Sequence, residues 1–131
     1  MEKNKTLETK VTDQDVDFYK HADYSNHLKW YKQGHQDFLE SNGLSFQEMQ
    51  ENYGVKTFVR HADVEYLGQL FEGNNISINT SVDKIGTTSM RYNQLITCEE
   101  KVVSKAKITV VFTDKYNKPT KVPDEIRQLL S

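Results

Sequence analysis

The spacing of apolar residues changes along this chain of 131 residues and separates helical from extended segments. Over residues 25–41 the apolar positions fall on one side of a helix with about 3.6 residues per turn. These positions are Leu28, Tyr31, Phe38 and Leu39. We expect this long helix to end at Ser41-Asn42-Gly43, because Gly43 suits the left-handed backbone that commonly follows a helix.

Two shorter helices are indicated by their first residues. Ser45 stands three residues before Glu48, a capping box in which each side chain can accept a hydrogen bond from the other's backbone N–H. The apolar side of this helix consists of Phe46, Met49 and Tyr53, and Gly54 ends it. Pro123 begins a last helical turn or two, and the two acidic residues that follow suit the positive end of a helix.

Between these helices the apolar spacing falls to two, which is typical of strands with one buried face. The positions expected to face inward are Ile76, Ile78, Thr80 and Val82 in one run, Met90, Tyr92, Gln94, Ile96 and Cys98 in a second, and Ala106, Ile108, Val110 and Phe112 in a third. Short connections at residues 83–86 and 99–101 predict antiparallel hairpins. With further strands at 57–66 and 7–12, the pattern predicts an α+β domain whose sheet of about five strands wraps around the long helix.

Composition and charge exclude several classes of protein. The formal net charge is −2, so no overall basic field favours a nucleic-acid partner. The first ten residues lack the apolar core of a secretory signal, and no stretch approaches the roughly 18 consecutive apolar residues of a membrane span. We expect a single cytoplasmic domain over residues 1–131. The lone Cys98 excludes an internal disulfide and is expected to be an inert, half-buried thiol.

Ionisable residues gather just before the long helix, but their spacing does not match a known metal site. Asp13, Asp15 and Asp17 alternate as in a calcium loop, yet the sixth and twelfth positions hold Phe18 and Tyr24 rather than Gly and Glu. The histidines at positions 21, 27 and 35 form no HExxH pair, and no further ligand is evident. We therefore expect no metal, and interpret the histidines at 27 and 35 as surface or capping residues.

Asp17 stands immediately upstream of a helix whose first turn offers unpaired N–H groups and a partial positive charge. Such a helix end can polarise a carbonyl oxygen, and a nearby carboxylate can attack the carbonyl carbon or deprotonate a water molecule. Aspartates before helices usually cap loops, and the chemistry of the residues alone favours that role. The two alternatives stay open at this level.

The segment DVDFYKHADYSNHLKW, from Asp15 to Trp30, resembles the D-x-D-x-x-G-H-V-N-N-x-x-Y-L-x-[WYF] signature of hotdog-fold acyl-CoA thioesterases of the 4-hydroxybenzoyl-CoA thioesterase type. The resemblance continues at 58–60 and 64–66, at 86–89 with Tyr92 and Gln94, and at 118–119 and 122–123, so that it covers nearly the whole chain. It implies a hotdog fold, in which an antiparallel five-stranded sheet wraps one long helix.

The resemblance also implies roles for individual residues. Asp17 matches the catalytic carboxylate, as nucleophile or general base, and the helix N-terminal amide that polarises the thioester carbonyl would belong to Tyr24. His21 would line the pocket, orient Asp17 or stabilise the loop. The substrate positions would be Thr88 and Ser89, although hydroxyls in a hairpin also serve turns. Lys118 and Lys121 would meet the phosphates of coenzyme A, with a solvated basic turn as the alternative.

The function that follows is hydrolysis of an acyl- or aroyl-CoA thioester to free acid and coenzyme A, with no further cofactor. Relatives of this fold are homodimers or homotetramers with sites between helix N-termini and a partner's sheet, so the resemblance implies a homo-oligomer. Alternatives are a carrier-protein thioesterase of polyketide type and a non-catalytic acyl-CoA binding module. Lys20 replaces a common Gly and is expected to alter the loop backbone, because Lys adopts positive φ less readily. Such departures leave the acyl group undetermined.

Overall fold

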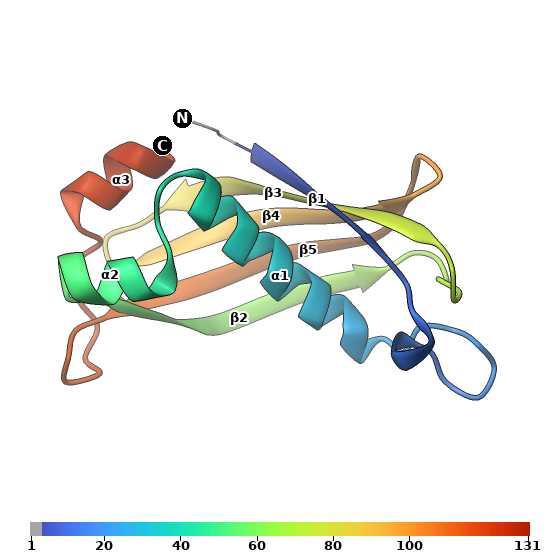
Figure 1. Ribbon diagram of the computed structural model, residues 1–131. Coiled ribbons are helices and arrows are strands. Elements are labelled where there is room, and N and C mark those ends of the chain that lie inside the picture. The colour runs from blue at the N-terminus through green and yellow to red at the C-terminus, as the bar shows by residue number, and fades with distance from the viewer. Residues whose placement is uncertain (1–3) are drawn as a thin grey trace.

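The computed structural model describes residues 4–131 and shows one sheet crossed on one face by a long helix (Figure 1). Residues 1–3, which the expected single domain includes, lie outside the described residues. The elements are β1 (Asn4–Lys10), the 3-10 turn η1 (Asp13–Asp15), α1 (Ser25–Ser41), α2 (Phe46–Tyr53), β2 (Lys56–Tyr66), β3 (Asn75–Ile85), β4 (Ser89–Cys98), β5 (Lys101–Thr113) and α3 (Asp124–Leu130). All strand pairs are antiparallel, in the order β1-β3-β4-β5-β2. The predicted fold class is confirmed.

The long helix has the predicted bounds, and its buried face is wider than the apolar pattern indicated. Of the four apolar positions on one helical side, Tyr31, Phe38 and Leu39 are buried and Leu28 is 47% exposed. His27 and His35 are 3% and 8% exposed, and their interpretation as surface or capping residues was wrong. Both imidazoles pack against core aromatic rings, His27 against Trp30 with centroids 5.5 Å apart and His35 against Tyr92 at 4.3 Å, so ring contacts replace water.

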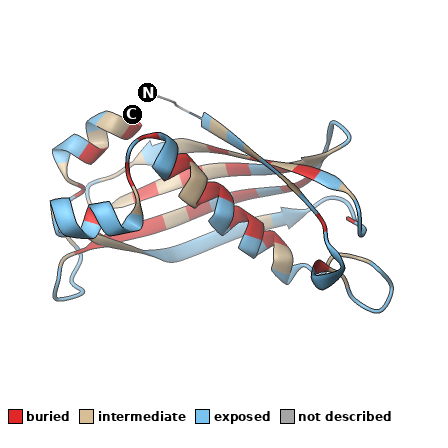
Figure 2. Ribbon diagram, in the orientation of Figure 1, coloured by how far each residue is buried: buried red, intermediate tan, exposed pale blue. Residues whose placement is uncertain are grey.

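The predicted alternation accounts for the inner face of the sheet. Met90, Tyr92, Gln94 and Ile96 of β4 are all buried, and the residues between them are half-buried or exposed. The first strand occupies Asn4–Lys10 rather than 7–12, because the chain leaves the ladder at Val11 and Thr12 forms the N-cap of η1. At the other edge, most of β2 is exposed along its 11 residues (Figure 2).

Gly34 allows α1 to approach the sheet closely. A Cβ built on this glycine would lie 2.6 Å from Ile78 Cγ2 and 3.0 Å from Thr80 Oγ1. At the same crossing, Gln94 Nε2 donates hydrogen bonds to the Tyr31 carbonyl at 2.8 Å and to Thr80 Oγ1 at 2.9 Å. The helix is therefore held against β3 and β4 by a contact that only glycine permits and by a buried amide that bridges helix and sheet.

We expect Gly34→Ala to lower the free energy of unfolding by about 1–3 kcal/mol, measured by chemical denaturation. Alanine favours a helix by up to about 1 kcal/mol over glycine, but its methyl group would overlap Ile78, which is fully buried. A double-mutant cycle provides the control. Ile78→Ala should lower the free energy of unfolding by less in the Gly34→Ala variant than in wild type. Strictly additive changes in this free energy would contradict the proposed overlap.

Candidate active site

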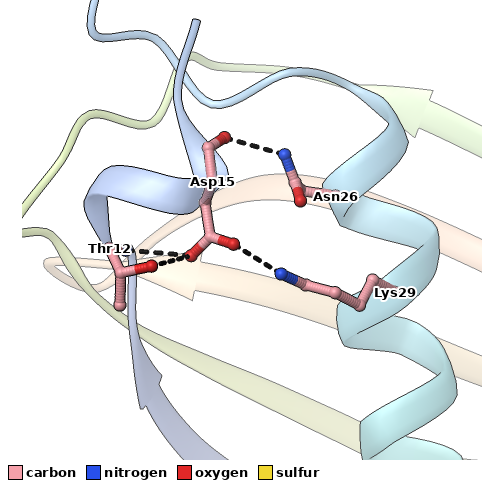
Figure 3. A network of polar contacts seen from close by, with 4 residues as sticks. All are labelled: Thr12, Asp15, Asn26 and Lys29. Atoms are coloured by element: carbon pink, nitrogen blue, oxygen red, sulfur yellow. Dashed lines mark hydrogen bonds and ion pairs between the residues drawn. The ribbon is translucent and has the colours of Figure 1, made fainter.

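The first aspartate of the D-x-D pair, Asp15, fastens the loop to the helix. Its side chain is buried, and its Oδ2 accepts hydrogen bonds from the Thr12 N–H at 2.9 Å and the Thr12 hydroxyl at 3.1 Å (Figure 3). Lys29 Nζ forms an ion pair with Oδ1, and Asn26 Nδ2 donates to the Asp15 carbonyl at 2.7 Å. Asp15 thus fixes where the loop meets the first two turns of α1.

The partners of the Asp15 carboxylate lower its pKa. Burial acts to raise the pKa of the Asp15 carboxyl, but the hydrogen bonds from Lys29 and Thr12 outweigh burial and hold that pKa below its usual value. A carboxylate with all of these partners is a structural group. No role was predicted for Asp15, because its partner Lys29 lies 14 residues away and was not recognised from the sequence.

Asp17 lies in a narrow loop closed by the backbone. Its N–H donates to the His21 carbonyl at 2.9 Å, and its own carbonyl accepts from the Lys20 N–H at 3.0 Å. The carboxylate uses one oxygen to order the loop, because Oδ1 accepts from the Tyr19 N–H at 2.9 Å and the His21 N–H at 3.2 Å. Within residues 4–131 Oδ2 accepts no hydrogen bond, and the residue is exposed. One carboxylate oxygen is anchored and the other faces outward.

His21 meets Asp17 through its backbone rather than through its imidazole. The ring of His21 packs edge-on against Phe71 with centroids 4.8 Å apart, and the two residues form an isolated β-bridge. Of the three roles open for His21, these contacts correspond most closely to loop stabilisation. The backbone amide also helps to position the Asp17 carboxylate.

Lys20 has a backbone conformation that favours glycine. Its φ is 66°, in the left-handed region. The loop keeps its shape at the cost of an unfavourable conformation for a residue with a Cβ. The contact from the Lys20 ammonium to Glu72, at 4.0 Å between exposed groups, adds little.

Replacing Lys20 by Gly should therefore raise the free energy of unfolding, by about 1 kcal/mol or less, because the left-handed backbone no longer strains a side chain. The measurement is thermal or urea unfolding at neutral pH. Asn117 provides a contrast, because it also has a positive φ, 62°, but asparagine tolerates this region well. Asn117→Gly should raise the free energy of unfolding by less than Lys20→Gly does. An equal increase for the two variants would contradict this explanation of the loop.

The beginning of α1 presents an amide close to this loop. Tyr24 is the N-cap residue, and the next three amides have local acceptors. The Ser25 N–H donates to Asp23 Oδ1 at 3.4 Å, and the Asn26 N–H donates to the Asp23 carbonyl at 2.9 Å. The His27 N–H donates to the Tyr24 carbonyl at 3.1 Å. The Tyr24 amide has no acceptor within the part of the chain that the structure describes. It lies at the positive end of a helix of 17 residues, where an oxyanion would be stabilised.

The remaining predicted site residues lie at the opposite end of the sheet (Figure 1). The Asp17 loop is joined to the Val103 end of β5 through residues 67–70, whereas the Thr88 carbonyl accepts from the N–H of Phe112 at 2.8 Å. Along an extended strand, the nine residue-to-residue steps from Val103 to Phe112 span about 30 Å. Lys118 and Lys121 follow β5 beyond this second end, where the Val122 N–H donates to the Thr87 carbonyl at 2.9 Å. One chain therefore does not bring Asp17 together with these residues.

A cleft of about 600 Å³ opens between α1, α2 and the β2 side of the sheet. Its walls are largely apolar and aromatic, and its polar lining residues include His35, Gln94, Lys32 and Gln36. The complete lining is Leu28, Tyr31, Lys32, His35, Gln36, Phe46, Thr57, Phe58, Val59, Ala62, Gln94, Ile108 and Val110. No pattern in the sequence indicates this cleft, because its shape depends on how α2 packs beside β2.

The model of the thioesterase-like superfamily matches residues 11–130. The chain belongs to this superfamily. The expected family and its hotdog fold are thereby confirmed, and so is the expected class of enzyme, a thioester hydrolase. None of the helices of this thioesterase-like protein within residues 4–131 is both long and apolar enough to cross a bilayer.

Three relatives illustrate the similarity. A 1,4-dihydroxy-2-naphthoyl-CoA hydrolase of Nostoc punctiforme is 28% identical over 95% of this chain and 85% of its own. The chloroplastic acyl-acyl carrier protein thioesterase ATL2 of Arabidopsis thaliana is 23% identical over 92% of this chain, which spans only 65% of that protein's length. A crystal structure of an aspartate-to-asparagine variant of 4-hydroxybenzoyl-CoA thioesterase with 4-hydroxybenzoyl-CoA superposes with a TM-score of 0.92 at 14% identity, covering 99% of this chain and 100% of that one. At this identity the structural match establishes the fold alone.

Proposed function

We propose that this thioesterase-like protein hydrolyses an acyl-CoA thioester, with Asp17 as the catalytic carboxylate. The observation that carries the proposal is the Asp17 loop itself, in which two backbone amides hold Oδ1 and leave Oδ2 without a described partner. The loop that holds this carboxylate leads into α1, whose Tyr24 amide has no acceptor within the described residues, so the segment contains the two parts that acyl transfer requires. The solved relative with a bound thioester carries an aspartate-to-asparagine substitution, which is consistent with carboxylate chemistry in that protein.

Two routes use these groups. In the nucleophilic route, Asp17 Oδ2 attacks the thioester carbon, the C–S bond breaks, coenzyme A leaves as its thiolate, and water then hydrolyses the mixed anhydride. In the general-base route, Oδ2 takes a proton from a water molecule that attacks the same carbon, and the C–S bond then breaks to release the free acid and coenzyme A as its thiolate. In both, the Tyr24 amide and the positive end of α1 stabilise the negative charge that develops on the carbonyl oxygen.

The active form that we propose is a homodimer formed at β2. This edge strand is long and exposes Phe58 and Val59 at 53% and 57%, a surface that soluble proteins normally cover. Tyr66, at one end of β2, contacts the ring of Tyr24 with centroids 6.2 Å apart. Lys56, at the other end, donates to Asn117 Oδ1 at 2.7 Å. Antiparallel pairing of two β2 strands would therefore bring the Asp17 end of one chain to the lysine end of its partner.

In such a dimer, the thioester would lie at Asp17 of one chain while the phosphates of coenzyme A meet Lys118 and Lys121 of the partner. Thr88 and Ser89 of the partner would approach the substrate from the same end. The arrangement accounts for the separation of about 30 Å between the two groups of residues within one chain.

Reversing the charge of both lysines should raise KM for acyl-CoA about tenfold and change kcat little, because these side chains bind phosphates away from the reacting carbon. The variant is Lys118→Glu/Lys121→Glu, assayed by steady-state kinetics. Lys105→Glu/Lys107→Glu is the matched control, with the same change in charge at exposed positions of β5. An equal effect of both pairs would show that only overall charge matters.

The test of the proposed function is a panel of short, medium, long and aromatic acyl-CoAs, assayed with a thiol reagent that detects released coenzyme A. Turnover of at least one member is expected. The similarity to a carrier-protein thioesterase makes thioesters of a pantetheine-loaded carrier protein a necessary second panel. If only carrier-protein thioesters are cleaved, the protein is a carrier-protein thioesterase rather than an acyl-CoA thioesterase. Saturable binding without thiol release would contradict hydrolysis and favour a binding module.

A further inference from the structure

The turn that follows β5 repeats the hydrogen-bond pattern of the Asp17 loop. Asp114 Oδ1 accepts hydrogen bonds from the Tyr116 N–H at 2.8 Å and the Lys118 N–H at 3.1 Å. In the same way, Asp17 Oδ1 accepts from the amides two and four residues further along the chain. The Asp114 N–H donates to the Lys118 carbonyl at 2.9 Å and closes the turn. Two parts of the chain therefore use one kind of turn, in which an aspartate holds the backbone and a tyrosine occupies the third position.

Tyr116 is held at the surface by this turn. The turn lies beyond the end of β5 (Figure 1), and Tyr116 is 69% exposed. The Lys115 ammonium lies 5.2 Å from the centroid of the phenol ring, and an exposed cation–π contact of this kind contributes little to stability. The backbone thus fixes an aromatic ring whose apolar surface is open to a ligand.

Ammonium groups gather at the same turn. Lys115 and Lys118 flank Tyr116 within it. The Lys56 ammonium reaches the turn from β2, where it donates to Asn117 Oδ1 at 2.7 Å. The single carboxylate of the turn uses one oxygen to hold the backbone. An exposed aromatic ring among ammonium groups can bind a nucleotide, because the ring stacks on the base while the cations attract the phosphates.

We propose that Tyr116 binds the purine base of the coenzyme A portion by stacking, and thereby makes the protein prefer coenzyme A thioesters to thioesters of phosphopantetheine. This inference rests on the proposed function, in which Lys118 meets the phosphates of the same coenzyme A. A lysine attracts a phosphate whatever carries it, because the interaction is with charge. Stacking requires a base, and the phosphopantetheine of a carrier protein has none. Tyr116 therefore separates two substrate classes that the lysines alone do not.

The alternative occupant of this ring is the partner subunit. Antiparallel pairing of two β2 strands would bring the turn to the Asp17 end of the second chain, where Phe18 and Tyr19 are 91% and 73% exposed. If Tyr116 packs against these side chains, its removal weakens the dimer and slows the cleavage of every thioester alike. Comparing substrates with and without a base distinguishes the two roles.

The test compares kcat/KM for two thioesters of the acyl group that the full-length protein cleaves fastest, one of coenzyme A and one of 4′-phosphopantetheine. Tyr116→Leu removes the ring and keeps an apolar side chain at an exposed position. It should lower the ratio of the two values about tenfold, because only the coenzyme A thioester loses a stacked base. Tyr116→Phe keeps the ring and should keep the wild-type ratio. The ratio is taken within one variant and so does not depend on the fraction that folds.

Tyr19→Leu is the matched control, because Tyr19 occupies the corresponding position of the Asp17 loop and is similarly exposed. Any change in activity should affect both thioesters equally, so the ratio should stay within about twofold of wild type. A ratio that does not fall in Tyr116→Leu would overturn the inference and leave the proposed function intact. A ratio that falls as far in Tyr116→Phe or Tyr19→Leu would also overturn it, since stacking on Tyr116 would not be the cause.

If wild type cleaves no acyl-CoA, the proposed function fails, and binding decides the inference. Isothermal titration calorimetry then measures the dissociation constants of coenzyme A and 4′-phosphopantetheine. Wild type should bind coenzyme A more tightly, and Tyr116→Leu should reduce this preference about tenfold. No binding of coenzyme A by wild type, or the same preference in both proteins, would overturn the inference.

Discussion

Replacing Asp17 by Asn is expected to lower kcat on the best acyl-CoA at least about 100-fold, because the amide can neither attack the thioester carbon nor take a proton from water. The fold should be unaffected. An asparagine oxygen can still accept the two hydrogen bonds from the Tyr19 and His21 amides, so the loop keeps its anchor. Single-turnover kinetics with a thiol reagent measures the chemical step separately from product release.

Asp13→Asn is the matched control for this experiment. Asp13 is an exposed carboxylate four residues earlier in the chain, so the same loss of charge is made without touching the proposed catalytic oxygen. Its turnover should stay within about twofold of wild type. A variant Asp17→Asn that keeps most of its activity would remove Asp17 from the mechanism, and equal losses in both variants would attribute the effect to charge alone.

Acidification from pH 7 to pH 4 should cost the protein about 3 kcal/mol of stability through His35 alone. Burial lowers the pKa of the His35 imidazole from 6.5 to about 4. Between these values the unfolded chain binds a proton at this residue that the folded chain does not, so stability is complete above pH 6.5 and falls as the pH drops toward 4. Each pKa unit corresponds to about 1.4 kcal/mol, which gives the total.

Urea denaturation of wild type and His35→Phe across this pH range isolates the contribution, because carboxyl groups titrate alike in both proteins. The variant should lose about 3 kcal/mol less than wild type. Burial raises the pKa of Tyr92, whose ring contacts His35, so this phenol stays neutral over the range. Parallel stability curves for the two proteins would mean that His35 is hydrated or already paired in solution.

Helical and strand periodicity predicted the architecture because each element carries its own signal. The bounds of α1 follow from apolar residues on one helical side and from Gly43, whose φ is 77°. Its buried face was only partly predicted, because a pattern that counts histidine as polar places His27 and His35 on the surface. Trp30 and Gly34, on the same helical side, were the available signal for a wider buried face.

The chemistry of the candidate site was less accessible to sequence reasoning. The D-x-D motif indicated Asp17, but it did not show that Asp15 is paired with Lys29 and serves structure. Nor did it reveal the distance between Asp17 and the lysines after β5, since that distance depends on the direction of each strand. The burial of His35 Nε2 without a hydrogen bond depends on side-chain packing between α1, α2 and β4, for which a single sequence carries no direct pattern.

We propose that Asp17 of one chain acts on an acyl-CoA whose coenzyme A portion is held by the lysines of a second chain. Activity of an isolated heterodimer tests it most directly, with one chain carrying Asp17→Asn and the other Lys118→Glu/Lys121→Glu under different affinity tags. At substrate concentrations below KM, the account predicts about half of wild-type activity, because one of the two sites then contains neither substitution. Activity no higher than that of the better parent homodimer would contradict a site shared between two chains.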